Sequence, residues 1–423
     1  MNKYAFQITN LYKPPFYIVL ICISLLLSFC LVYAGMATTP DSWTYIDGAY
    51  NLSNGLGYNY ICNHAKIVAF QPLYSFYMSL FMTLNTSHGL SILISNAILL
   101  LLTVLIFVYI KNQNQKSENT FVAKLLLLTF IIYLSRNYLF ILSENLFYPA
   151  FFISLYLLNN LKQKIRIDHF CYIIVIDIFM ISTRNSAIIF CISSCIFIYM
   201  SSYKSTLHRL FLILIKLAIA YLAFKLSKYL YGAVNSHPME FGNARYHWYE
   251  YLIQSIGDIA SPLISSNFLI RTYYLHILSF TVIIILLYFL KFKISTQMIL
   301  FIVISYTLLF IVINMVDIFD PLNGRYLAFI YLVLFAFSDV SVRKRSKLIT
   351  IAVSLSFCLS CFSTCYLYLS NAGLVNKKQI GFRAIKGNHY ILVEPEHQLQ
   401  NDPNEIIRAG KHYVISPCYS WTK

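Results

Sequence analysis

The sequence predicts an all-α polytopic membrane protein, and three observations lead to this fold class. Hydrophobic residues make up 59% of the 423 residues and charged residues only 11%, whereas soluble domains carry roughly a quarter charged residues. The apolar residues gather in about eleven runs near the length that crosses roughly 30 Å of hydrocarbon. The short loops between these runs are basic in alternation. With a mean hydropathy of +0.66, the chain is excluded from the soluble cytosolic and secreted classes.

The apolar runs predict the membrane spans in order along the chain. The first run is longer than the roughly 7–15 residues of a signal-peptide core, so we expect a retained anchor. Three short runs, 121–135, 170–183 and 325–339, have the alternative of being half-spans or wrongly divided pairs. The expected spans are 15–37, 89–110, 121–135, 138–159, 170–183, 184–200, 209–231, 271–290, 295–315, 325–339 and 347–370.

The net charge of +16 reflects topology rather than a nucleic-acid partner. The cations fall in alternate short loops, which is the positive-inside pattern. We therefore expect an integral protein of the plasma (inner) membrane with a cytoplasmic N-terminus and, for an odd number of spans, an extracytoplasmic C-terminus. The cations that define this pattern are Lys3, Lys13, Lys111, Lys116, Lys162, Lys164, Arg166, Lys204, Arg209, Lys291, Lys293, Arg343, Lys344, Arg345 and Lys347.

Three outward segments are long: about 38–88, about 232–270 and the tail 371–423. In the first, DSWTYIDGAYNLSNG predicts an interfacial helix, and PLYSFYMSLFMTL predicts a second one. A full span over the second segment is the alternative, and it would invert every later loop. In the tail, HYILVE and HYVIS predict strands. The expected organisation is a membrane module over 1–370 and a small extracytoplasmic domain over 371–423.

The first outer loop carries a spaced motif, D-S-W-x-Y-x-x-x-A-x-N-L-x-x-G-x-G from Asp41, followed by F-x-P-L-Y from Phe70. This motif resembles the first extracytoplasmic loop of the GT-C membrane glycosyltransferases, which include the protein O-mannosyltransferases and the aminoarabinose transferases of lipid A. Weaker similarities are S-E-N-L-F at 143–147 and N-G-R-Y-L at 323–327. The family often has an Asp-Glu pair, whereas here Ser42 follows Asp41.

The resemblance implies a GT-C-like bundle that moves a sugar from a polyprenyl-phosphate donor to a lipid, glycan or protein acceptor, with inversion. Asp41 matches the catalytic position and would be the base. The remaining candidates fall into three groups: assisting acids Asp47 and Glu144; donor-phosphate cations Lys66, Arg325 and Arg184; and loop-shaping residues Tyr45, Gly55, Pro72 and Tyr74.

Each candidate has a structural alternative. Asp41 would serve as a helix N-cap, and Asp47 as a solvated or structural acid. Glu144 would be a buried carboxylate paired with Arg136 or Arg184, and the cations would be interfacial anchors. Away from the outer loop, Asp177 and Lys216 are ionisable residues near mid-membrane in neighbouring spans, for which we expect a structural ion pair.

Functional alternatives also stay open at this point: a transporter or flippase for lipid-linked sugars, or an envelope-polysaccharide assembly protein. The sequence contains no P-loop, Rossmann fingerprint, HExxH or nucleophile elbow. No cofactor is indicated, and neither is a metal, because the Cys358, Cys361 and Cys365 cluster lies in an apolar span. Cys62 and Cys418 are the two cysteines that could form a disulfide between the tail and the first loop.

Overall fold

A computed structural model gives the fold of the following parts of the chain. The expected outer loop 232–270 and most of the spans expected at 271–290, 295–315 and 325–339 lie outside the described residues. The described residues are 15–38, 40–59, 66–67, 70–84, 88–113, 121–161, 167–184, 187–200, 205–230, 290–294, 304–306, 308–309, 332–333, 336, 338–342, 347–371, 383–386, 389–391, 406–409 and 412–415.

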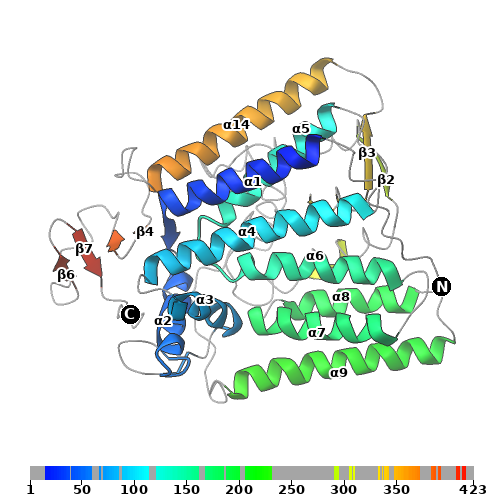
Figure 1. Ribbon diagram of the computed structural model, residues 1–423. Coiled ribbons are helices and arrows are strands. Elements are labelled where there is room, and N and C mark those ends of the chain that lie inside the picture. Colours follow the sequence, from blue (N-terminus) through cyan, green and yellow to red (C-terminus); the bar gives the residue numbers. More distant parts are fainter. Residues whose placement is uncertain are drawn as a thin grey trace, which may run out of the picture.

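Eight of the expected apolar runs are helices. They lie side by side in a bundle (Figure 1), where α4 packs between α1 and α6, α7 packs between α6 and α9, and α5 packs against α14. The prediction of a helical fold is confirmed for this part of the chain. The helices are α1 (Pro15–Ala34), α4 (His88–Gln113), α5 (Phe121–Asn137), α6 (Glu144–Leu161), α7 (Ile167–Thr183), α8 (Ala187–Met200), α9 (Thr206–Leu230) and α14 (Lys347–Asn371).

Four of the described helices are long and apolar enough to cross a membrane. Their outer faces carry large apolar side chains, for example Phe29 (70% exposed), Leu214 (65%) and Phe362 (68%). Such surfaces are unfavourable in water and suit contact with lipid. The four segments are Phe16–Ala34, His88–Gln113, Thr206–Leu226 and Ile349–Leu369.

Helix α6 begins at Glu144, whereas the sequence pattern predicted a span from residue 138. The preceding residues form a turn, in which the Leu139 and Phe140 amides donate to the carbonyls of Arg136 (3.2 Å) and Asn137 (3.1 Å). The Tyr138 hydroxyl lies 2.6 Å from Thr103 Oγ1 of α4, which fixes this turn against the bundle. Glu144 is therefore in the first turn of α6, whereas a span that began at residue 138 would place it almost two turns inside the helix.

The two ends of the bundle differ in charge. Helices α4, α6 and α8 end, and α5, α7 and α9 begin, at the end that we call the basic end, because the Lys- and Arg-rich connections adjoin it. Helices α2 (Pro40–Ser53) and α3 (Leu73–Leu84) lie at the opposite end, called the loop end (Figure 1). This segregation of charge is the arrangement that a positive-inside protein requires.

Short strands adjoin the bundle. In the tail, β4 (Arg383–Lys386) pairs with β5 (His389–Ile391), and β6 (Ile406–Ala409) with β7 (His412–Ile415), so both predicted strand runs form strands. Strand β1 (Met36–Thr38), just before α2, pairs antiparallel with β4. The tail and the first outer loop therefore lie on the same side.

A second ladder corrects the expected spans at two points. Strand β2 (Leu290–Ile294) pairs antiparallel with β3 (Ser338–Val342). Residue 290, which the expected span 271–290 included, and residues 338–339, which the expected span 325–339 included, are therefore strand and not helix. The sequence LKFKI alternates apolar and charged side chains, which is the period of a strand rather than of a helix.

Candidate functional site

Helix α2 holds most of the resemblance motif. It begins at Pro40, because the fixed φ and missing N–H of proline suit the first turn of a helix. Asp41 is therefore inside the first turn, whereas an N-cap residue would directly precede the helix. The side chain of Asp41 lies outside the described residues. The helix ends at Ser53, where Gly55 and Gly57 have φ of 72° and 83°, a conformation that favours glycine.

Helix α3 packs on α2 through aromatic rings. Tyr45 is buried, and its ring centroid lies 5.3 Å from that of Phe70 and 5.2 Å from that of Tyr74. The Ser75 hydroxyl donates to the Tyr45 carbonyl (2.9 Å), which ties the two helix backbones together. Pro72 is buried, and its carbonyl accepts the Phe76 amide at the start of α3 (2.8 Å). These contacts make α2 and α3 one packed unit.

Hydroxyl groups dock α2 onto the start of α6. Ser42 Oγ donates to the Ile141 carbonyl (2.7 Å), and the Tyr45 hydroxyl donates to Ser143 Oγ (3.0 Å). Ser143 Oγ in turn donates to Glu144 Oε2 (3.4 Å). All of these hydroxyls are buried, so the contacts cannot be exchanged for water without cost. Asp41 precedes Ser42 in the chain, and its backbone thus lies beside the turn that leads to Glu144.

Glu144 forms an ion pair with Arg184, one of the two partners that its structural alternative names. Arg184 Nη1 lies 3.1 Å from Glu144 Oε1, and the guanidinium carbon lies 5.8 Å from the Phe147 ring centroid. Arg184 occupies the connection between α7 and α8, where its amide donates to the Met180 carbonyl (3.0 Å). Its side chain is 13% exposed and that of Glu144 is 5% exposed. The pair is therefore nearly enclosed, with the cation nearer the surface.

The remaining candidates are placed as follows. Asp47 is 1% exposed, so the alternative of a solvated acid is wrong, and its side chain lies on the buried side of α2. Lys66 is exposed and forms a backbone bridge with Asn59, just beyond the end of α2. Arg325 lies outside the described residues. The structure thus brings α2, Glu144 and Arg184 together, and it places Lys66 on the same loop.

A buried polar network next to this site was not anticipated from the sequence. The Tyr74 hydroxyl and Asn145 Nδ2 both donate to Asn96 Oδ1, at 2.7 and 2.9 Å. Burial raises the pKa of the Tyr74 phenol, against the opposing effect of its hydrogen bond to Asn96. The network joins α3, α4 and α6. The one available signal was an asparagine inside an otherwise apolar span.

Gly48 is a second feature that was overlooked. A Cβ atom at this position would lie 2.3 Å from Cε2 of Tyr58, closer than side-chain atoms can approach. Tyr58 itself is buried, and its hydroxyl donates to the Gln71 carbonyl (3.4 Å). The glycine therefore lets the loop after α2 fold back onto the helix.

The expected pair of Asp177 and Lys216 is confirmed. Lys216 Nζ donates to Asp177 Oδ2 and, at 2.8 Å, to Ser194 Oγ, so the charges join α7, α9 and α8. Asp177 is 2% and Lys216 1% exposed. Within the described ranges, no three His, Cys, Asp or Glu side chains are grouped to hold a metal ion.

Comparison of the chain with protein-family models, with characterised proteins and with solved structures finds no match.

Proposed function

We propose that this protein is an integral-membrane glycosyltransferase of the GT-C type, which moves a sugar from a polyprenyl-phosphate donor to an acceptor on the extracytoplasmic face. The proposed fold is a bundle of about eleven spans, with the N-terminus in the cytoplasm and the loop end outside. Four apolar helices and the separation of basic loops from α2 and α3 support this arrangement.

The observation that carries the proposal is the docking of α2 on the Glu144–Arg184 pair. Ser42 and Tyr45 fix α2 to residues 141–143, and Glu144 starts the next helix. The segment with the resemblance motif is thus held beside a carboxylate and a guanidinium at the loop end. Acids and a cation in one place are what sugar transfer from a phosphate requires: one to accept a proton, the other to neutralise the leaving group.

In the proposed reaction, Asp41 is the general base. The acceptor hydroxyl oxygen attacks the anomeric carbon from the face opposite the phosphate, and its proton passes to the Asp41 carboxylate. The bond between the anomeric carbon and the phosphate oxygen breaks, and polyprenyl phosphate leaves with the electron pair. One carboxylate suffices for this step, because the phosphate needs charge neutralisation rather than protonation. The product has the inverted configuration.

The cations would stabilise the leaving phosphate. Arg184 is held by Glu144 and stays partly exposed, so its planar guanidinium presents a fixed edge suited to phosphate oxygens. Lys66 is exposed on the loop after α2 and would add a point charge. Arg325 is the third candidate, on the N-G-R-Y-L motif. Glu144 is then a positioning residue for Arg184, and Asp47 a buried acid that supports α2.

The proposal is tested first in cells and then on one residue. Mass spectrometry of lipid carriers and envelope glycans, with and without this protein, should show an accumulated donor lipid and a missing sugar. Asp41→Asn should reproduce that loss, with transfer reduced at least 100-fold, a typical contribution of general-base catalysis. Asp168→Asn is the matched control, because Asp168 is an exposed acid in the first turn of α7, at the basic end.

Asn at position 41 retains a hydrogen-bonding side chain but cannot take up a proton at neutral pH. A purified Asp41→Asn protein that transfers sugar from its lipid donor at the normal rate would refute the assignment of the base. An envelope unchanged by removal of the protein would refute the glycosyltransferase proposal itself.

A transporter or flippase for lipid-linked sugars is the second candidate. The enclosed Asp177–Lys216 pair favours it, since ionisable pairs inside membrane bundles often mark transport pathways. The two candidates differ in their demand on Asp41. A transporter should keep its function in the Asp41→Asn variant, and its loss in cells should leave the sugar donor on the inner leaflet.

A further inference from the structure

The buried amides of Asn96 and Asn145 meet between α4 and α6, next to Glu144. Both residues are 0% exposed, and Asn145 Nδ2 donates to Asn96 Oδ1 at 2.9 Å. Asn96 Nδ2 donates to the Ile92 carbonyl of its own helix (3.0 Å), so its oxygen is the atom that faces α6. An amide inside an apolar helix such as α4 costs free energy unless its groups are paired. The Asn96 oxygen meets that condition through donors from other elements.

Asn145 closes the turn that precedes α6. Its Nδ2 also donates to the Phe140 carbonyl (2.8 Å), and its own carbonyl accepts the Tyr138 hydroxyl (3.3 Å). Glu144 directly precedes Asn145 and lies in the first turn of α6. The position of the Glu144 carboxylate, and with it that of the Arg184 guanidinium, therefore depends on how this turn is held.

Glu144 is held through both of its neighbours in the chain. On one side, Ser143 accepts the Tyr45 hydroxyl of α2 (3.0 Å). On the other side, Asn145 donates to Asn96 of α4. Hydrogen bonds are directional, so these two contacts fix both ends of the short segment that carries the carboxylate. Helix α2, the ion pair and α4 are thereby kept in one relative arrangement.

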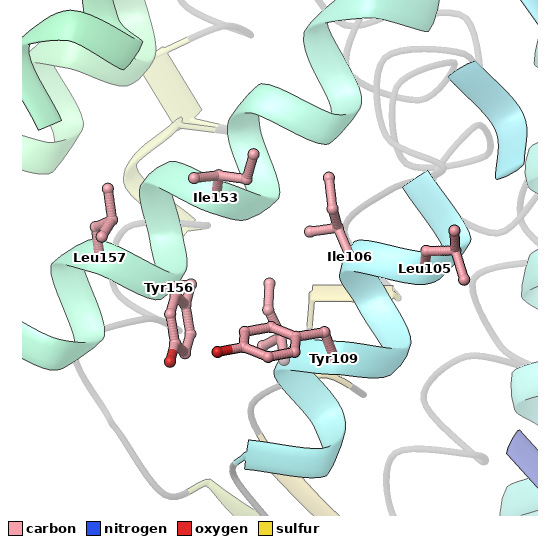
Figure 2. A pocket seen from close by; sticks show the side chains of 7 residues that line it. Leu105, Ile106, Tyr109, Ile153, Tyr156 and Leu157 are labelled. Carbon is pink, nitrogen blue, oxygen red and sulfur yellow. The ribbon is translucent and has the colours of Figure 1, made fainter. Parts of the chain in front are cut away.

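Farther toward the basic end, α4 and α6 meet through apolar and aromatic side chains. The rings of Tyr109 and Tyr156 lie 5.7 Å apart there, at a groove of about 400 Å³ between the two helices (Figure 2). Apolar contact is non-directional, and a groove leaves room for one helix to shift against the other. The hydrogen bond between Asn96 and Asn145 gives the same two helices a directional contact at the loop end.

The two amides are not placed for stability alone. Among the described residues no donor reaches Asn145 Oδ1, although this atom is buried, and a buried carbonyl oxygen without a donor costs stability. Asn96 is not the sole attachment of α3 to α4 either, because the Tyr77 hydroxyl of α3 donates to the Ser95 carbonyl (2.9 Å). Departures from the most stable arrangement are expected where a side chain serves function.

We propose that Asn96 and Asn145 are positioning residues for sugar transfer, an inference that rests on the function proposed above. Their hydrogen bond holds Glu144 and Arg184 in register with α2, so that the leaving phosphate meets its cation while Asp41 takes the proton. Both amides are enclosed and act through the turn before α6 rather than on the substrate. Transfer depends on this register because a misplacement of about 1 Å can cost roughly 100-fold in rate.

The first test does not depend on the function. The full chain in detergent is treated with phenylglyoxal, a reagent for guanidinium groups, and modification of Arg184 is followed by mass spectrometry of its peptide. Asn96→Ala should loosen the ion pair, so that Arg184 reacts about fivefold faster, the effect expected from one lost hydrogen bond. Ser28→Ala is the matched control, because Ser28 Oγ of α1 donates to the Ala97 carbonyl of α4 (3.1 Å), next to Asn96.

The second test measures sugar transfer per folded molecule. Asn96→Ala should lower kcat by roughly tenfold or more and leave the KM of the donor nearly unchanged, because the amide touches no substrate. In a Glu144→Gln background the same substitution should have little further effect, because it acts through Glu144. Asn145→Ala removes the other partner and should give the same results. A merely structural role would lower the amount of folded protein and leave kcat per folded molecule unchanged.

Equal labelling of Arg184 in the unaltered and Asn96→Ala proteins would overturn the proposal, whatever reaction the protein catalyses. So would equally fast labelling in Ser28→Ala, or a normal kcat in Asn96→Ala. An unaltered protein that transfers no sugar would refute the proposed function instead, and the labelling of Arg184 would still decide whether the amides position the ion pair.

Discussion

Removing one charge of the Asp177–Lys216 pair should destabilise the bundle more than removing both. Lys216→Met leaves the Asp177 carboxylate enclosed between α7, α8 and α9 without its cation, and Ser194 loses the hydrogen bond from Nζ. Asp177→Leu leaves the ammonium enclosed in the same way. Replacing both residues together removes the charges and keeps apolar volume in the space between the helices.

The magnitude follows from burial. With side-chain exposures of 0% for Lys216 and 3% for Asp177, solvent screens neither charge. Breaking a buried pair from one side costs about 3–5 kcal/mol, whereas replacing the whole pair by apolar residues is often neutral or stabilising. We therefore expect a loss of about that size for each single variant and a near-native double variant. The coupling between the two sites should be several kcal/mol and of opposite sign to the single losses.

The assay is unfolding of the detergent-solubilised protein, measured for the unaltered protein, the two single variants and the double variant. Lys225→Met is the matched control, because Lys225 lies on the same helix but is exposed, and it should have little effect. Harmless single variants, or losses that simply add in the double variant, would refute the argument that the pair is a structural clamp. The double variant should also retain sugar transfer, and its failure to do so with normal stability would favour transport.

Four further predictions concern the loop end and the C-terminal tail. Gly48→Ala should destabilise α2 by about 1–3 kcal/mol through overpacking, because the added Cβ would meet the Tyr58 ring. Increased proteolysis of the loop would detect the destabilisation, and adding Tyr58→Leu should reverse it. Tyr74→Phe should cost about 0.5–1.5 kcal/mol, because Asn96 Oδ1 loses one of its two buried donors and keeps the hydrogen bond from Asn145. Burial raises the pKa of Tyr74, so the stability contributed by its protonated phenol is present below the unfolded pKa of about 10 and is lost as pH rises above it; an alkaline unfolding series checks this, and a flat profile would contradict it. A reporter fused after Lys423 should be active only outside the cytoplasm, and cytoplasmic activity would show that the number of spans is even.

Composition and apolar runs were sufficient to predict the helices, because lipid-facing helices must be apolar over nearly their whole length. The start of α6 was not predictable in this way. Tyr138, Leu139 and Phe140 are as apolar as the helix that follows, and only the contact between Tyr138 and Thr103 of α4 shows that they form a turn. An apolar run marks residues that leave water, but it does not mark where the chain reverses within the protein.

The candidate site was likewise predictable only in part from the sequence. The motif in the first loop drew attention to α2, and the ionisable residues inside expected spans drew attention to Glu144, Asp177 and Lys216. Their partners depended on contacts between distant segments. Ser42 and Tyr45 reach the chain almost one hundred residues later, and no local pattern encodes the position of a hydroxyl against a carbonyl of another helix.

The two ion pairs are alike in chemistry, and exposure separates their roles. Each pair joins segments of the chain from different helices, and the sequence offered a structural explanation for each. The Asp177–Lys216 side chains are 3% and 0% exposed, so no ligand reaches them without opening the bundle. The Arg184 side chain is 13% exposed. Its partner Glu144 accepts a hydrogen bond from the Ser143 hydroxyl, which in turn accepts one from the Tyr45 hydroxyl of α2. A pair that is held from the protein side and open on the other can stabilise the fold and still meet a phosphate. This difference in access, rather than the charges themselves, makes the Glu144–Arg184 pair at the loop end the better candidate for ligand binding.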